Sequence, residues 1–124
     1  MSKAVDLDQL ATVIGEFPFA FLVSVAEDAS PHVLSVLPRF ESGTLVVDGV
    51  GRHTQANVGA SGRATLVWPP TDPADFSLIV DGAATCVGST LRIEPTSGIY
   101  HRPAVDADGT RTGSDCAPIS SPTP

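Results

Sequence analysis

Short runs of apolar residues separated by turn-forming residues predict a chain built mostly from strands. Residues 19–25 are apolar on both faces of the strand that they would form, which is typical of a buried strand. The turn residues of 27–31 lead into 32–40, which we expect to return antiparallel to the first strand. A second tight turn at 41–43 leads into a third strand at 44–47. Three successive strands with short connections predict a β-meander.

Two short helices are expected beside these strands. In residues 6–15 the apolar side chains fall on one stripe, with Asp6 placed to cap the helix and Gly15 placed to end it. A second short helix is expected within 52–61, ended by one of the glycines near its end, although its apolar periodicity is weak.

The later apolar runs predict the remaining strands. Residues 63–68 read as one strand, and 76–87 read as a longer strand that passes Gly82 through a bulge. Residues 90–101 return after a tight turn, and Pro95 favours an edge or a bulge there. We therefore expect a mainly β fold, a small antiparallel barrel of six to seven strands with two short helices.

The composition changes after residue 102. Residues 103–124 are rich in Pro, Gly, Ser, Thr and Asp, which cannot bury a core of their own. We expect one folded domain over residues 1–102, since 124 residues suffice for a single core. The segment 103–124 is expected to be a tail that is disordered or ordered only against a partner.

Charge and cysteine content narrow the classes of function. Seven Lys and Arg residues against 14 Asp and Glu residues give a net charge of −7. Such an acidic surface repels phosphate backbones and anionic lipids, so we expect neither a nucleic-acid nor a membrane partner. The apolar runs are too short to cross a bilayer, the first residues lack a signal-peptide pattern, and two cysteines make no disulfide framework. These features favour a cytoplasmic protein.

One segment departs from the acidic composition. Residues 49–71 contain no Asp or Glu, and this segment follows one predicted strand and begins the second predicted helix. Its cationic residues are Arg52, His53 and Arg63. Free N–H groups at a helix N-terminus attract anions, most commonly phosphate. Thr54 is placed to donate its hydroxyl, and Asn57 projects from the same helix face. A solvated turn capped by Thr54 is the alternative interpretation.

The order of these segments resembles the FMN-binding split-barrel family, the pyridoxamine 5′-phosphate oxidase-like superfamily. The resemblance rests on 51–58 (Gly-Arg-His-Thr-Gln-Ala-Asn-Val) followed by 63–67 (Arg-Ala-Thr-Leu-Val). It extends to 30–33 (Ser-Pro-His-Val) and 80–84 (Val-Asp-Gly-Ala-Ala), and together these motifs cover residues 5–102. It implies a split β-barrel homodimer with FMN at the subunit interface.

The resemblance also assigns residues to the cofactor site. The implied FMN-binding residues are Ser35, Val36, Leu37, Arg52, His53, Thr54, Asn57 and Arg63. By analogy, His53 and Thr54 contact the phosphate and Asn57 supports that loop. The three residues of the second strand offer backbone groups to the isoalloxazine ring, and Arg52 or Arg63 adds charge near the phosphate or ribityl chain. No catalytic side chain and no metal ligand is assigned, because a flavin carries the chemistry itself.

Two features depart from the family pattern. Where many relatives carry lysine, this chain has His53, a weaker and titratable cation. If His53 is the phosphate cation, FMN affinity should weaken as the pH rises above about 7. The hairpin at 87–90 is also shorter than the helix-containing connection of larger members.

The other two histidines are expected to lie outside this site. His32 begins a predicted strand and is expected at the surface. His101 is expected at a strand end, and a place near the dimer interface or the mouth of the pocket is the alternative. Because the three histidines are far apart in the sequence and no carboxylate pattern joins them, we expect no zinc site.

The expected function follows from the resemblance. It implies a flavin-dependent oxidoreductase that passes electrons or hydride to a small-molecule acceptor, with a second copy and a small electron donor as partners. A deazaflavin cosubstrate is a related option, for which few basic residues are available. Two alternatives from other classes stay open. One is a non-enzymatic FMN carrier or sensor, and the other is a barrel that has lost its cofactor and serves as an interaction protein.

Overall fold

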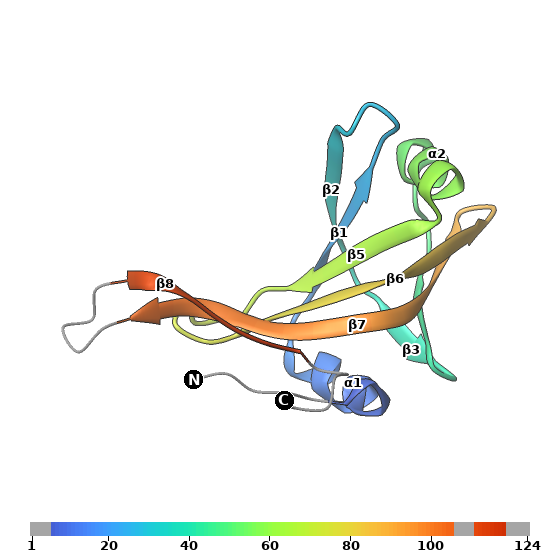
Figure 1. Cartoon of the computed structure of the whole chain (residues 1–124). Helices are drawn as coiled ribbons and strands as arrows, with labels where there is room; N and C mark the ends of the chain where they lie inside the picture. Colours follow the sequence, from blue (N-terminus) through green and yellow to red (C-terminus); the bar gives the residue numbers. More distant parts are fainter. Residues whose placement is uncertain (1–5, 106–110, 119–124) are drawn as a thin grey trace.

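A bent antiparallel sheet forms the body of the protein in the computed structural model, which describes residues 6–105 and 111–118 (Figure 1). Its strands are β1 (Ala20–Val25), β2 (Pro31–Val36), β3 (Arg39–Glu41), β4 (Thr44–Val47), β5 (Arg63–Trp68), β6 (Ser77–Val87), β7 (Thr90–Val105) and β8 (Arg111–Pro118). Their order across the sheet is β2-β1-β5-β6-β7-β4-β3, and β8 pairs with β7. All seven pairings are antiparallel. The predicted mainly β fold is confirmed.

The expected meander is wrong at one point, and that point makes the barrel split. Residues 32–40 form two strands instead of one, and these two strands, β2 and β3, lie at opposite edges of the sheet. Leu37 and Pro38 separate them. Proline lacks the N–H that a continuing ladder requires, so the strand ends there. The chain crosses from one edge to the other at this point, and hydrogen bonds do not close the sheet.

Two helical segments flank the sheet, as the sequence predicts. The first runs through η1 (Leu7–Gln9), α1 (Leu10–Val13) and η2 (Ile14–Glu16), and the second is α2 (Arg52–Ser61). In Figure 1 α2 lies above β5, β6 and β7, and α1 lies below them. Asp6 precedes the first segment but makes no side-chain capping hydrogen bond. Gly62 ends α2 in the left-handed conformation, with φ +67°, which glycine adopts without steric cost.

The bulge predicted at Gly82 is confirmed. The register of β6 and β7 shifts there, with Asp81 opposite Ser97 but Gly82 opposite Pro95. A Cβ atom on Gly82 would lie 2.4 Å from the carbonyl oxygen of Glu94, so only glycine fits. Pro95 is tolerated in this central strand because the bulge interrupts the ladder.

The core lies inside the curve of the sheet. Its largest fully buried aliphatic residues are Leu10, Leu22, Leu45, Leu66, Leu78, Leu91 and Ile93. Trp68 is also buried there, so it belongs to the core. Leu10 anchors the first helical segment, and Val58 anchors α2 to the same cluster.

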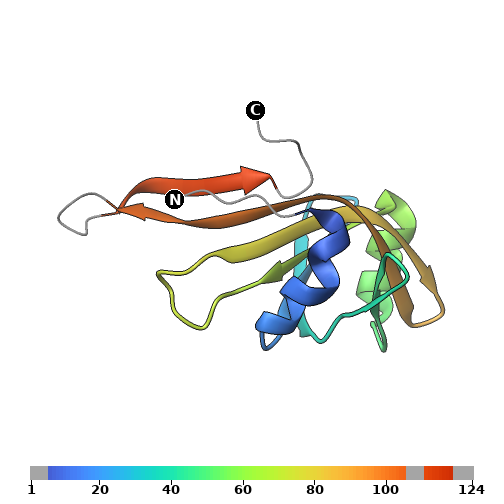
Figure 2. The same cartoon turned by 90° about the horizontal axis from the view of Figure 1, so that it is seen from below.

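The segment after residue 102 differs from the disordered tail that its composition predicts. Strand β7 continues to Val105, and residues 111–118 form β8 beside it, as Figure 2 shows in red. On this edge of β7, β4 pairs only with Leu91, Arg92 and Ile93. The later part of the same edge therefore offers unpaired backbone groups, which β8 satisfies. Within the described part of the chain, no helix is long and apolar enough to span a membrane.

Candidate functional site

The first turn of α2 provides uncapped backbone donors. Gly51 precedes the helix in an extended conformation, and no side chain caps the helix N-terminus. Two contacts hold this start in place. The N–H of Val50 donates to the Ser89 carbonyl at 2.9 Å, and Nε2 of Gln55 donates to the Val50 carbonyl at 2.8 Å. Free N–H groups and the helix dipole together attract an anion at such a position.

Two buried polar side chains of α2 lie near this start. Thr54 is only 1% exposed, and its Oγ1 has no hydrogen-bond partner among the described residues. A buried hydroxyl without a partner costs about 1–3 kcal/mol, which an anion accepting its hydrogen bond would relieve. Asn57 is also buried, and its Nδ2 donates to the buried Oγ of Ser24 at 3.1 Å. Asn57 therefore ties α2 to β1.

A pair of histidines stands beside these residues. The rings of His32 and His53 meet edge to face, with their centroids 5.5 Å apart. The sequence expectation that separated His32 from the acid-free segment is wrong, because the β1–β2 hairpin folds against the N-terminal half of α2. The two rings border a cavity of about 370 Å³ that is also lined by Ala26, Ser30, Pro31, Ala56 and Asn57. Over the residues that the structure describes, no group of three or more His, Cys, Asp or Glu side chains is placed to hold a metal ion.

The second-strand residues predicted to contact a flavin ring line a neighbouring cavity. This cavity of about 510 Å³ is bordered by Phe19, Phe21, Ser35, Val36 and Leu37. Strand β2 is an edge strand, so one row of its backbone N–H and C=O groups has no strand partner. His32 and Ser35 are three residues apart on β2, which corresponds to about 10 Å. Residues of β2 therefore border both cavities.

The two arginines of the predicted site lie at opposite ends of α2. Arg52 is its first residue, while Arg63 follows the glycine that ends it. Ten helical residues span about 15 Å, so Arg63 does not reach the N-terminal end of its own α2. Both side chains are exposed, and no ion pair involving either is found among the described residues. Arg39, by contrast, is neutralised by Glu41 and Asp48.

An apolar surface covers the outer face of the β1–β2 hairpin. Phe21, Val33 and Leu37 are 37%, 55% and 78% exposed. Phe21 lies opposite Ser35 and Val23 lies opposite Val33, so these alternate residues share one face of the hairpin. Contiguous exposed apolar surface of this kind commonly marks an interaction site.

Sequence reasoning missed two residues of this region. Ser24 and His32 lie directly opposite each other in the β1–β2 pairing. Residues 32–40 are already predicted from the sequence to return antiparallel to 19–25. That predicted hairpin is the signal that could have placed Ser24 beside His32. Only the packing of α2 against the hairpin shows that both residues face the acid-free segment.

Comparisons with known proteins place the chain in a family. No protein-family model matches it. It is 32% identical over 140 residues to an uncharacterized protein of Mycobacterium bovis, an alignment that covers 98% of this chain and 99% of the relative. An uncharacterized protein of Mycobacterium tuberculosis matches it with the same identity and coverage. The chain belongs to the family of these mycobacterial proteins.

Solved structures show the wider fold class. A candidate pyridoxamine 5′-phosphate oxidase from Listeria innocua superposes with a TM-score of 0.64 at 15% identity, covering 76% of this chain and 96% of that one. A pyridoxamine 5′-phosphate oxidase-related, FMN-binding protein from Nostoc punctiforme gives 0.58 at 9% identity, covering 88% and 90%. A heme-binding protein from Mycobacterium smegmatis gives 0.61 at 12% identity, covering 94% and 59%. These structural matches confirm the split-barrel fold that the sequence resemblance implied.

Proposed function

We propose that the protein binds FMN, with the phosphate at the N-terminus of α2. One observation carries this proposal. The first turn of α2 is uncapped, lies in an acid-free segment, and contains Thr54, whose buried hydroxyl has no partner among the described residues. His53 adds an imidazole on the same turn, and Arg52 adds a positive charge. Asn57 acts indirectly, since it holds the helix against Ser24.

The rest of the cofactor fits along β2. Its free edge offers backbone donors and acceptors to the polar edge of an isoalloxazine ring, at Ser35, Val36 and Leu37. Phe19 and Phe21 supply an apolar wall in the same cavity. When bound, FMN supplies hydride and single-electron transfer. The chain's own residues then bind, orient and desolvate the cofactor.

We expect the working form to be a homodimer. The exposed apolar face of the hairpin, containing Phe21, Val33 and Leu37, supports this expectation because a second copy would cover it. The same face borders the cavity proposed for the flavin ring, so a partner subunit would also help to enclose that ring.

The expected activity is a flavin-dependent oxidoreductase that passes electrons or hydride to a small-molecule acceptor. The described residues that line the β2 cavity include no acid or base. They would select and orient an acceptor without exchanging protons with it. A non-enzymatic FMN carrier would bind the cofactor equally well but show no turnover with NAD(P)H.

Heme is the second candidate ligand. The specific observation that favours it is the neighbouring imidazoles of His32 and His53 at one cavity. Imidazole is a common axial ligand of heme iron. The Mycobacterium smegmatis protein of similar fold is described as heme-binding.

Parallel titrations of the purified protein with FMN and with hemin distinguish the two candidate ligands. FMN binding is followed by flavin fluorescence, and hemin binding by the Soret absorbance. The informative variant is Thr54→Val, which removes the hydroxyl and keeps the shape, and Thr12→Val at an exposed position of α1 is the matched control. Loss of a hydrogen bond to a charged group should weaken FMN binding about 10- to 100-fold in Thr54→Val alone. Absence of FMN binding at about 100 μM would contradict the proposal, and hemin binding lost in His32→Ala would then favour heme.

A further inference from the structure

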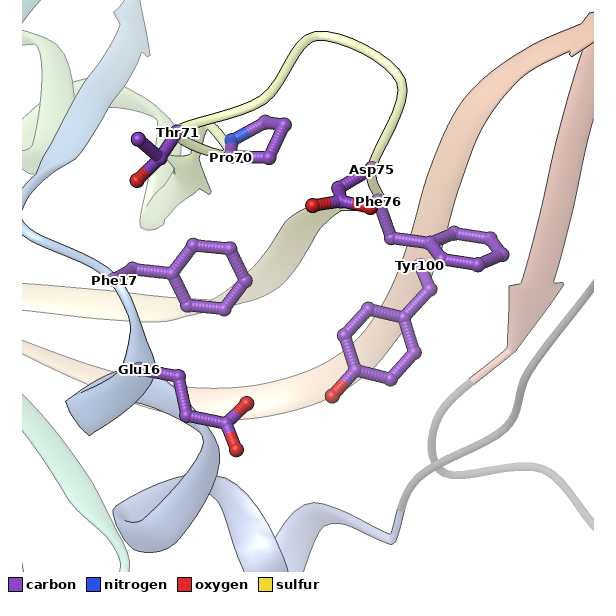
Figure 3. Close-up of a pocket in the computed structure, with 7 residues that line it drawn as sticks. All are labelled: Glu16, Phe17, Pro70, Thr71, Asp75, Phe76 and Tyr100. Atoms are coloured by element: carbon purple, nitrogen blue, oxygen red, sulfur yellow. The ribbon is translucent and has the colours of Figure 1, made fainter.

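A third cavity lies at the far end of β5 from α2. Its volume is about 310 Å³, and its lining includes Glu16, Phe17, Asp75, Phe76 and Tyr100. These residues come from the end of the first helical segment, the loop between β5 and β6, and strand β7, as Figure 3 shows. Strand β5 begins directly after Gly62 and has six residues, which span about 20 Å. The cavity is therefore far from α2, where the FMN phosphate is proposed to bind, whereas Phe17 is two residues from Phe19 of the cavity proposed for the flavin ring.

Aromatic rings form its walls. The rings of Phe76 and Tyr100 pack with their centroids 5.7 Å apart, and Phe17 faces them from the other side of the cavity (Figure 3). Ring faces attract cations through their quadrupole. This cluster already holds one cation, because the guanidinium carbon of Arg102 lies 4.5 Å from the centroid of the Phe76 ring.

Two carboxylates give the cavity its charge. In Figure 3 the side chains of Glu16 and Asp75 extend toward the space between the rings. Burial, together with the charge of Glu16, raises the pKa of the Tyr100 hydroxyl above its ordinary value. Among the described residues, the lining contains no Lys, Arg or His.

We propose that this cavity binds a small organic ammonium ion. Its positive charge would be stabilised by Glu16 and Asp75, and its apolar groups would contact the rings of Phe17, Phe76 and Tyr100. An anion would be repelled by the two carboxylates. A bare divalent metal ion fits poorly, because aromatic rings supply none of the six to eight oxygen ligands that calcium takes. Pockets of about 300 Å³ are at the lower end of the range for small-molecule sites.

The probe for this proposal is choline, compared with 3,3-dimethylbutan-1-ol, which has the same shape without the charge. Tyr100 is the only tyrosine in the chain, so its ring signals in NMR spectra report on this cavity alone. We expect choline to shift these signals and to bind about tenfold more tightly than the neutral analogue.

Variants assign the binding to the two carboxylates. Glu16→Gln and Asp75→Asn keep the side-chain shape, and each should weaken choline binding about three- to tenfold. Glu94→Gln, an exposed position on β7, is the control with the same change of charge and should leave the affinity unchanged. Urea unfolding of each variant verifies that the fold is retained.

Three results would overturn the proposal. One is equal binding of the neutral analogue, which would make the cavity merely apolar. Another is undiminished choline binding in the Glu16→Gln/Asp75→Asn double variant. The third is no shift of the Tyr100 signals at about 100 mM choline, a concentration at which even very weak binding is detected.

Discussion

Replacing Asn57 with alanine tests whether a buried hydrogen bond helps to hold α2 in its functional position. The Asn57 side chain is 8% exposed and Ser24 is 1% exposed, so water does not readily replace either partner. Their hydrogen bond measures 3.1 Å between Nδ2 and Oγ. Removing the amide leaves the Ser24 hydroxyl buried with one partner fewer, at a cost of about 1–3 kcal/mol. For a domain of this size, about 1 kcal/mol lowers Tm by about 4 °C or somewhat more.

A double-mutant cycle isolates the hydrogen bond from general loss of packing. The variants are Asn57→Ala, Ser24→Ala and the double substitution, each measured by urea unfolding. If the two side chains act on each other, the double variant loses about 1 kcal/mol less stability than the two single losses added together. The control is Ala56→Gly, a substitution at an exposed neighbouring position of the same helix, combined with Ser24→Ala, whose effects should add. Additive losses for the Asn57 and Ser24 pair would refute the reasoning.

The same cycle has a functional readout. Because the bond ties α2, the helix proposed to bind the phosphate, to β1, FMN affinity should fall in Asn57→Ala even where the protein stays fully folded. We expect a loss smaller than that of Thr54→Val, since Asn57 positions the helix and does not contact the phosphate. A larger loss in Asn57→Ala than in Thr54→Val would place the amide at the ligand.

Three further predictions concern the site, the sheet and the outer face. His53→Ala should weaken FMN binding about three- to tenfold, because it removes an imidazole from the proposed phosphate site, and an unchanged affinity would remove His53 from that site. Gly82→Ala should cost about 1–3 kcal/mol in urea unfolding, because its Cβ would meet a backbone carbonyl oxygen at 2.4 Å. Gly59→Ala, with nothing within 4 Å, should instead stabilise α2 by about 0.5–1 kcal/mol, and equal effects at the two glycines would contradict the bulge geometry. Val33→Lys should convert a dimer into a monomer in sedimentation experiments, and a dimer that persists would exclude the β1–β2 hairpin face as its interface.

The sequence by itself predicts those helices, strands and bulges whose ends are set by adjacent residues. A short helix was predicted within 52–61, ended near Gly59 or Gly62, and the structure ends it at Gly62 in a left-handed conformation. The strand 63–68 and the bulge at Gly82 were equally readable, since apolar alternation and a glycine between strand-forming residues mark them directly. The acid-free segment was visible in composition alone. These features need no knowledge of distant parts of the chain.

The tertiary structure alone decided which of these elements meet. The chain turns at Pro38, so that one apolar run forms two strands at opposite edges of the sheet. The apolar pattern before Pro38 continues after it, so the pattern does not reveal this separation. The approach of His32 to His53, and of Ser24 to Asn57, depends on how the hairpin packs against α2. Likewise, residues 111–118 become a strand only because β7 offers them a free edge. The apolar periodicity of a segment indicates which of its faces is buried. Which strands pair and which helix packs on them depends on contacts between distant residues, and no local pattern specifies those contacts.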